Sequence, residues 1–268
     1  MPLGASTSAS EDLLFERSGR IATFTINRPT EQNRLTPDAL AMLEAQAHLL
    51  AGDPETSVIV IRGAGEMCFS TGILNPALRA QFGKREVVDL VRLANRAFDA
   101  VDSLPQIVIA SLSGATRAGG AELALACDIR LAASNATISF PEAAWGGFPG
   151  GGGPARLATL VGRGRALELI GTCREIDAAE MERIGLVQDV HSPETLAGAT
   201  QALADKIAAA GPLATSGAKR IITTRLGQGA PEAGALSQAL RYALEWSEDV
   251  DEGIAAHREG RPPRFTGQ

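Results

Sequence analysis

The stretch that decides the fold class is IVIASLSGATRAGGAELALACD, residues 107–128. Its first six residues are mostly apolar and follow Pro105, which is the pattern of a short strand covered on both faces of a sheet. A glycine-rich loop comes next, and Gly119 with Gly120 opens a run free of helix breakers that ends near Cys127. The stretch therefore predicts a buried strand, a tight loop and a helix in immediate succession.

Strand and helix signals also alternate upstream of this stretch. Alternating side chains predict a strand at residues 21–27, and an apolar β-branched run predicts a buried strand at 58–61. Between them Thr36 caps an amphipathic helix that Gly52 ends, and residues 87–101 carry a second helical pattern. This repeated switching is typical of a layered α/β domain.

The alternation continues downstream and then gives way to helices. The further expected elements are strands at 129–132, 137–140 and 186–190, and helices at 155–160 and at 178–184 behind the cap Asp177. From about residue 200 onward helical patterns dominate. We therefore expect a flexible tail at residues 1–12, an α/β core at 13–199 and a C-terminal helical region at 200–268.

Composition and charge exclude several classes of function. The 268 residues are 45% hydrophobic and 21% charged, ordinary globular values, so the chain should fold around one large core with an appendage. The net charge of -6 and the 4% of aromatic residues disfavour nucleic acid and membrane surfaces as partners. No apolar stretch reaches the ~20 residues of a membrane-spanning helix. Three scattered cysteines favour a reducing compartment, the cytoplasm.

Motifs for metal and nucleotide chemistry are missing from the sequence. The three histidines His48, His191 and His257 have no neighbouring ligands at metal-site spacing, and no serine sits in a Gly-x-Ser-x-Gly elbow. The glycine-rich loops match neither a Walker phosphate loop nor the dinucleotide fingerprint. We therefore expect no metal site, and a zinc enzyme or a serine hydrolase is disfavoured.

Three glycine-rich stretches are candidates for chemistry, at residues 69–73, 114–122 and 141–153. Glycine lets the backbone approach a ligand closely, and the helix start at Gly119 offers free N–H groups with a partial positive charge. Such a place suits a developing oxyanion. The residues alone leave structural alternatives open: ordinary turns, a mobile loop, and helix-cap or surface roles for Glu122 and Glu142.

Taken in this order, the three stretches resemble the crotonase (enoyl-CoA hydratase/isomerase) superfamily over about residues 13–267. The motifs that carry the resemblance are Asn27-Arg28-Pro29 with Asn33, the strand and loop 61–72, the signature 119–128, Pro141-Glu142 with 149–152, the block 177–187 and the ending 252–265. Each block is weak by itself. The resemblance is specific because all of these blocks occur together in the order found in the family.

The resemblance implies both a fold and a site. The fold is an α/β spiral of β-β-α units with a C-terminal helical region used in trimer formation, and the trimers commonly pair into hexamers. The implied oxyanion hole consists of the N–H groups of Ile73 and Gly119. Glu122 and Glu142 fall on the two positions that are both glutamate in the family's hydratases, where proton exchange with water and substrate requires them.

The implied activity is that of a hydratase, a lyase that adds water to a trans-2-enoyl-CoA. Isomerisation, thioester hydrolysis, decarboxylation and a non-catalytic CoA-binding role remain alternatives.

No separate cofactor is expected, because coenzyme A is part of the substrate. The residues implied to contact it are Arg28, Thr71, Gly72 and Arg117. Arg117 replaces a small or apolar family residue and could face a CoA phosphate, an acidic acyl group or solvent. His257 and Gly260 replace the family's Phe and Lys near the adenosine phosphate.

Overall fold

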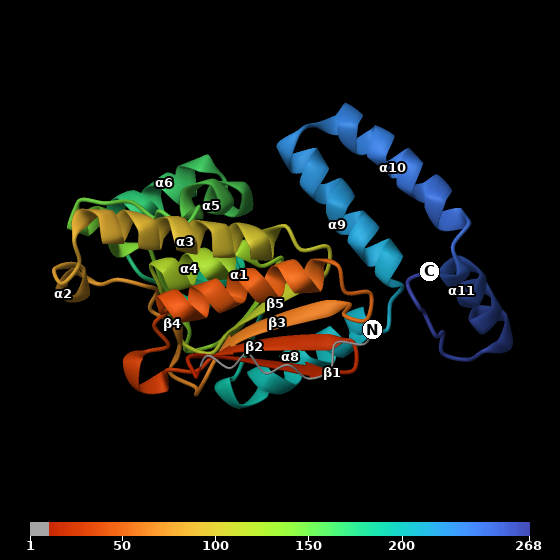
Figure 1. The fold of residues 1–268 in the computed structure, drawn as a ribbon, viewed down its shortest axis with the longest axis horizontal. Coiled ribbons are helices and arrows are strands. Elements are labelled where there is room, and N and C mark those ends of the chain that lie inside the picture. Colours follow the sequence, from red (N-terminus) through yellow and green to blue (C-terminus); the bar gives the residue numbers. More distant parts are fainter. Residues whose placement is uncertain (1–10) are drawn as a thin grey trace.

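The computed structural model describes residues 11–268 as two β-sheets surrounded by helices (Figure 1). Most of the tail expected at residues 1–12 lies outside the described residues. The large sheet has the strand order β1-β2-β3-β5-β7-β10, and all neighbours are parallel except β1 and β2. Its strands are β1 (Leu13–Ser18), β2 (Ile21–Ile26), β3 (Val58–Gly63), β5 (Ile107–Leu112), β7 (Ile129–Ala133) and β10 (Asp189–His191).

The central strands β3 and β5 are covered on both faces. Helices α1 (Pro37–Ala51), α3 (Lys84–Asp102) and α4 (Gly119–Ala126) lie on one side of the large sheet, and α8 (Pro193–Ala208) lies on the other (Figure 1). This cover explains why both strands are continuous apolar runs without polar alternation. The bounds of β5 are those that the sequence predicts, while β3 continues two residues further, to Gly63.

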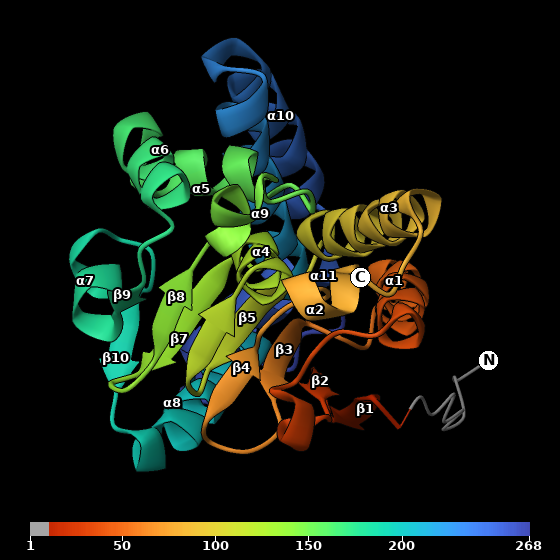
Figure 2. The ribbon, with the colours of Figure 1, turned by 90° about the vertical axis from the view of Figure 1, so that its left-hand side faces the viewer.

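A second, smaller sheet of very short strands has the order β4-β6-β8-β9 (Figure 2). Its strands are β4 (Cys68–Ser70), β6 (Ala115–Arg117), β8 (Thr137–Ser139) and β9 (Ile176–Asp177). The first three each follow a strand of the large sheet directly and lead into a helix: α2 (Pro76–Arg79) with α3 after β4, α4 after β6, and the 3-10 turn η2 (Pro141–Trp145) with α5 (Gly153–Val161) after β8. This succession confirms the expected β-β-α units.

Two predicted helix caps are present. The N–H of Ala39 donates to Thr36 Oγ1 at 3.2 Å at the start of α1, and the N–H of Glu180 donates to Asp177 Oδ1 at 2.8 Å at the start of α7 (Ala178–Arg183). Each cap satisfies a backbone donor that the first helical turn leaves free. These local signals therefore placed both helix starts correctly.

The strand predicted at residues 186–190 is wrong in its position. The observed strand is β10, and the apolar residues Leu186 and Val187 lie in the turn before it. Both side chains are buried in the core, so their apolar character reflects packing and not strand pairing. A short apolar run cannot by itself separate these two situations.

The C-terminal helices α9 (Pro212–Gly227), α10 (Ala230–Glu245) and α11 (Glu248–Glu259) project away from the two sheets (Figure 1). The unpredicted helix α6 (Arg163–Thr172) follows α5. The expected boundary at residue 199 falls inside α8, which packs on the large sheet, and the division into domains stays a prediction. Within residues 11–268, every helix is too short or too polar to cross a membrane.

Candidate active site

The first two glycine-rich stretches meet where β4 and β6 end. Gly72 follows β4 with φ +85°, and a Cβ atom built on it would lie 2.5 Å from the backbone nitrogen of Gly119. Gly119 begins α4 directly after β6. Real Cβ atoms do not approach other atoms this closely, so only glycine permits this contact between the two bends.

Two backbone donors remain free at this meeting point. Among the described residues, no acceptor lies within hydrogen-bond reach of the N–H groups of Ile73 and Gly119. Gly119 belongs to the first helical turn, whose N–H groups have no partner inside the helix. The Ile73 side chain lies beside Gly119, with Cδ1 and Cγ1 each 3.1 Å from the position of a Cβ there. The sequence-predicted pair Ile73 and Gly119 is therefore brought together.

The residue before Gly119 has an unusual backbone conformation. Ala118 adopts φ +50° and ψ -128°, a region that residues with a side chain rarely occupy. Its N–H donates to the carbonyl oxygen of Ser139 in the neighbouring strand β8 at 3.2 Å, which helps to hold it there. Strain of this kind costs about 1–3 kcal/mol and is concentrated at functional sites.

Glu122 lies in the first turn of α4 and is 3% exposed. Its Oε1 accepts hydrogen bonds from the N–H groups of Gly151 at 2.7 Å and Gly153 at 2.9 Å, both in the third glycine-rich stretch. Burial raises the pKa of Glu122 to about 7, and the nearby Glu142 carboxylate adds to the rise. The two amides and Arg156 offset part of it. Glu122 can therefore gain or lose a proton near neutral pH.

Glu142 comes from η2, in the loop after β8. Its Oε2 is fully buried and has no hydrogen-bond partner among the described residues. Burial raises the pKa of Glu142 as well. A buried carboxylate oxygen without a hydrogen-bond partner destabilises a folded protein, so this oxygen indicates that a ligand or water donates a hydrogen bond to it. The structure thus brings Glu122 and Glu142 close enough for their charges to interact.

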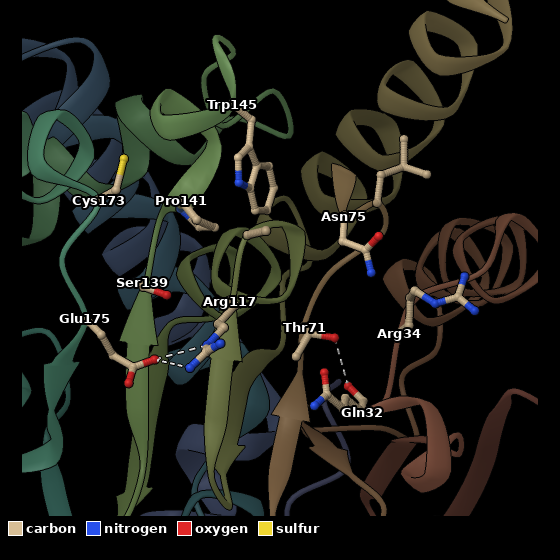
Figure 3. Close-up of a pocket in the computed structure, with 12 residues that line it drawn as sticks. Gln32, Arg34, Thr71, Asn75, Arg117, Ser139, Pro141, Trp145, Cys173 and Glu175 are labelled. Carbon is tan, nitrogen blue, oxygen red and sulfur yellow. Dashed lines mark hydrogen bonds and ion pairs between the residues drawn. The ribbon is translucent and has the colours of Figure 1, made fainter. Parts of the chain in front are cut away.

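A cavity of about 400 Å³ opens beside these groups (Figure 3). Thr71 and Arg117 line it, together with Ala118 and Pro141, the neighbours in sequence of Gly119 and Glu142. The volume falls within the range of small-molecule sites. The lining residues that sequence reasoning did not assign to the site are Gln32, Arg34, Leu74, Asn75, Ser139, Trp145, Cys173 and Glu175.

Two predicted coenzyme contacts have protein partners. Arg117 donates from Nε and Nη2 to Glu175 Oε2 at 3.0 and 2.6 Å, across the cavity wall in Figure 3. Arg28 pairs with Asp12 at 2.7 Å and also with Glu31, and it is not among the residues that line the cavity. Within residues 11–268, no group of three His, Cys, Asp or Glu side chains could hold a metal ion.

These features define an α/β protein with two unpaired main-chain donors near a buried carboxylate, Glu122, and a partly buried one, Glu142. The chain belongs to the enoyl-CoA hydratase/isomerase family, whose family model matches residues 16–268. This result confirms the crotonase resemblance of the sequence motifs.

Named relatives support the same assignment. The chain is 36% identical to the short-chain-enoyl-CoA hydratase of Clostridium acetobutylicum over 79% of this chain and 80% of that protein. It is 32% identical to the crotonyl-CoA hydratase of Syntrophomonas wolfei, with 96% and 98% covered. A crystal structure of an enoyl-CoA hydratase from Bacillus anthracis superposes with a TM-score of 0.92 at 31% identity, over 96% of this chain and 100% of that chain.

Proposed function

We propose that this protein is a hydratase that adds water to the double bond of a trans-2-enoyl-CoA. The observation that carries the proposal is a pair of interacting carboxylates, the buried Glu122 and the partly buried Glu142, near the free N–H groups of Ile73 and Gly119. Hydration requires one group to take a proton from water and one to supply a proton at Cα, which two carboxylates can do together.

The proposed reaction begins with the thioester carbonyl oxygen on the N–H groups of Ile73 and Gly119. When water attacks Cβ, negative charge moves onto this oxygen, and two fixed donors stabilise it without rearranging. Glu122 holds the attacking water through Oε2, since Oε1 already accepts from two amides. Glu142 takes a proton from this water as the water oxygen bonds to Cβ, and the protonated Glu142 then delivers a proton to Cα, which restores its carboxylate.

The coenzyme A part of the substrate would occupy the cavity of Figure 3. The proposed contacts are Thr71 and Arg117 on its walls and Gly72, the neighbour of Thr71 in sequence. No separate cofactor takes part in the reaction. Arg34 adds a second cation to the lining, which suits a phosphorylated ligand. The contact predicted for Arg28 would require release from Asp12 or a ligand that reaches past the cavity.

Crotonyl-CoA tests the proposed activity directly. Loss of the absorbance of the conjugated thioester on addition of the protein is the expected result, because hydration removes the conjugated double bond. Isomerisation needs one acid/base and is the second candidate, so a 3-enoyl-CoA should react much more slowly than the 2-enoyl-CoA. Absence of turnover with short, medium and long 2-enoyl-CoAs would refute the proposed hydratase activity. Binding of CoA without turnover would favour a non-catalytic CoA-binding role.

We also propose that the chain assembles into homotrimers, alone or paired into hexamers, through the region 200–268. The support is a set of large apolar side chains that are more than half exposed on the projecting helices: Ile222, Leu226, Tyr242 and Trp246. Monomers rarely leave so many such side chains in contact with water. Light scattering should give three or six times the 27.8 kDa chain mass. The cytoplasm is the proposed location, because all three cysteines are free thiols.

A further inference from the structure

A polar stripe on α3 faces the glycine-rich loop that holds Glu122. Asn95, Asp99 and Asp102 are spaced by four and three residues, so they lie on one face of the helix. Asn95 Nδ2 donates to the carbonyl oxygen of Gly150 at 3.1 Å. Asp99 and Asp102 accept from the guanidinium of Arg156 on α5, at 2.5 and 3.1 Å. The stripe therefore contacts the loop directly through Asn95 and indirectly through Arg156.

Arg156 connects this stripe to the loop peptide next to Glu122. Its Nη1 donates to the carbonyl oxygen of Gly151 at 2.8 Å, and its side chain is 13% exposed. The N–H of this same Gly151 donates to Glu122 Oε1, and the N–H of Gly153 donates to the same oxygen. Arg156 thus fixes the peptide that lies between the two peptides that bind Glu122.

We infer that Arg156 is a positioning residue for Glu122: it clamps the glycine loop so that two loop amides hold this carboxylate in place. The inference deepens the proposed hydratase function and rests on it for its catalytic consequence. Arg156 touches neither Glu122 Oε1 nor the cavity lining, so it acts through Gly151 and through its charge.

The loop composition explains why a clamp is needed. Residues 150–153 are all glycine, and glycine has the largest backbone freedom of any residue. A side chain at several of these positions would collide with Glu122 or Arg156, so glycine is required there. Contacts with other residues must then restrict the backbone conformation of the loop. Arg156 does this with three of its nitrogen atoms at once, on Asp99, Asp102 and Gly151. A lysine presents one compact charge and cannot bridge the same three acceptors.

Loss of the clamp should change the proton affinity of Glu122. The charged groups that act on it are Glu142 on η2 and Arg156 on α5, and Arg156 in turn is paired with Asp99 and Asp102 on α3. Without Arg156 the cation and the fixed amides that favour the carboxylate are both weakened, while Asp99 and Asp102 lose their partner. All of these changes act in the same direction and raise the pKa of Glu122.

The test compares Arg156→Gln and Arg156→Lys with the control Arg96→Gln. Arg96 lies on α3, the helix that carries Asp99 and Asp102, and it also pairs with a carboxylate, Glu44, but it makes no hydrogen bond to the glycine loop. Carbon-13 NMR of labelled glutamate side chains would follow the titration of Glu122, assigned by its loss in Glu122→Gln. We expect the Glu122 transition to move to higher pH in both Arg156 variants and to stay unchanged in Arg96→Gln. An unchanged transition in Arg156→Gln would overturn the inference.

Kinetics give the catalytic half of the test. Arg156→Gln should lower kcat for 2-enoyl-CoA hydration by about 10- to 100-fold with KM within about threefold, as expected when a catalytic group is misplaced by a fraction of an ångström. In a Glu122→Gln background the same change should cost less than about threefold, because the clamp then has no carboxylate to position. Equal losses in both backgrounds would refute action through Glu122. A shifted titration with no turnover by the wild type would instead refute the proposed function alone.

Discussion

The contact between Gly72 and Gly119 makes Gly72→Ala the most informative single substitution. The added Cβ would lie 2.5 Å from the backbone nitrogen of Gly119, whereas ordinary contacts begin near 3.4 Å. The two bends must therefore separate by about 0.9 Å, and the N–H of Ile73, the next residue, moves with them. One of the two proposed donors would then miss the thioester oxygen, which typically costs about 3 kcal/mol of transition-state stabilisation, or roughly 100-fold in kcat.

The control for this substitution is Gly185→Ala. Gly185 has a similar left-handed φ of +76°, but a Cβ there would meet nothing within 4 Å. Both variants lose about 1–2 kcal/mol of folding stability from the left-handed conformation, which urea denaturation measures. Only Gly72→Ala should lose hydration of crotonyl-CoA. If a folded Gly72→Ala kept more than a third of the wild-type kcat, the two bends would not form the carbonyl site.

Three further predictions concern the two glutamates of the site and the ion pair between Lys219 and Asp128. Glu142→Gln and Glu122→Gln should each lower kcat by ~100-fold or more with little change in CoA affinity, since only proton transfers are lost; losses below tenfold for both, in steady-state assays, would contradict the assigned roles. The pKa of Glu122 is raised to about 7, so the folded protein binds this proton more tightly than the unfolded chain does. The free energy of unfolding of the wild type should therefore fall by up to about 3 kcal/mol between pH 4.5 and 7, relative to that of Glu122→Gln. Urea titrations at each pH measure this difference. Lys219→Met should destabilise the fold by about 1.5–3 kcal/mol in the same titrations, because Asp128 then loses the ammonium group 2.6 Å away and keeps the N–H of Val108 as a donor; a loss below about 0.5 kcal/mol would refute that role.

The sequence was sufficient for the elements whose signals are local. The strands β3 and β5 are uniformly apolar between breakers, and the caps Thr36 and Asp177 mark helix starts by their own side chains. The second sheet was not predictable in this way. Strands such as β4 and β6 are three residues long and form only because neighbouring chain segments pair with them, which no local period records.

The sequence likewise indicated some residues of the site and missed others. Glu122 and Gly119 lie in one signature, and the motif context was enough to select them. The amides that hold Glu122 come from Gly151 and Gly153, about thirty residues away, and the clamp Arg156 is bound from α3. Such contacts depend on tertiary packing, so no spacing in the sequence indicates them. Glu175 was missed for the same reason, because it lies just before β9 and reaches Arg117 on β6 past the intervening strand β8.

A crystal structure with an unreactive thioester analogue of a 2-enoyl-CoA tests the central claim most directly. The thioester carbonyl oxygen should lie about 2.7–3.1 Å from the backbone nitrogens of both Ile73 and Gly119, with the β-carbon facing Glu122 and Glu142. A carbonyl oxygen bound elsewhere, or the Ile73 side chain occupying this position while the analogue binds, would contradict the account.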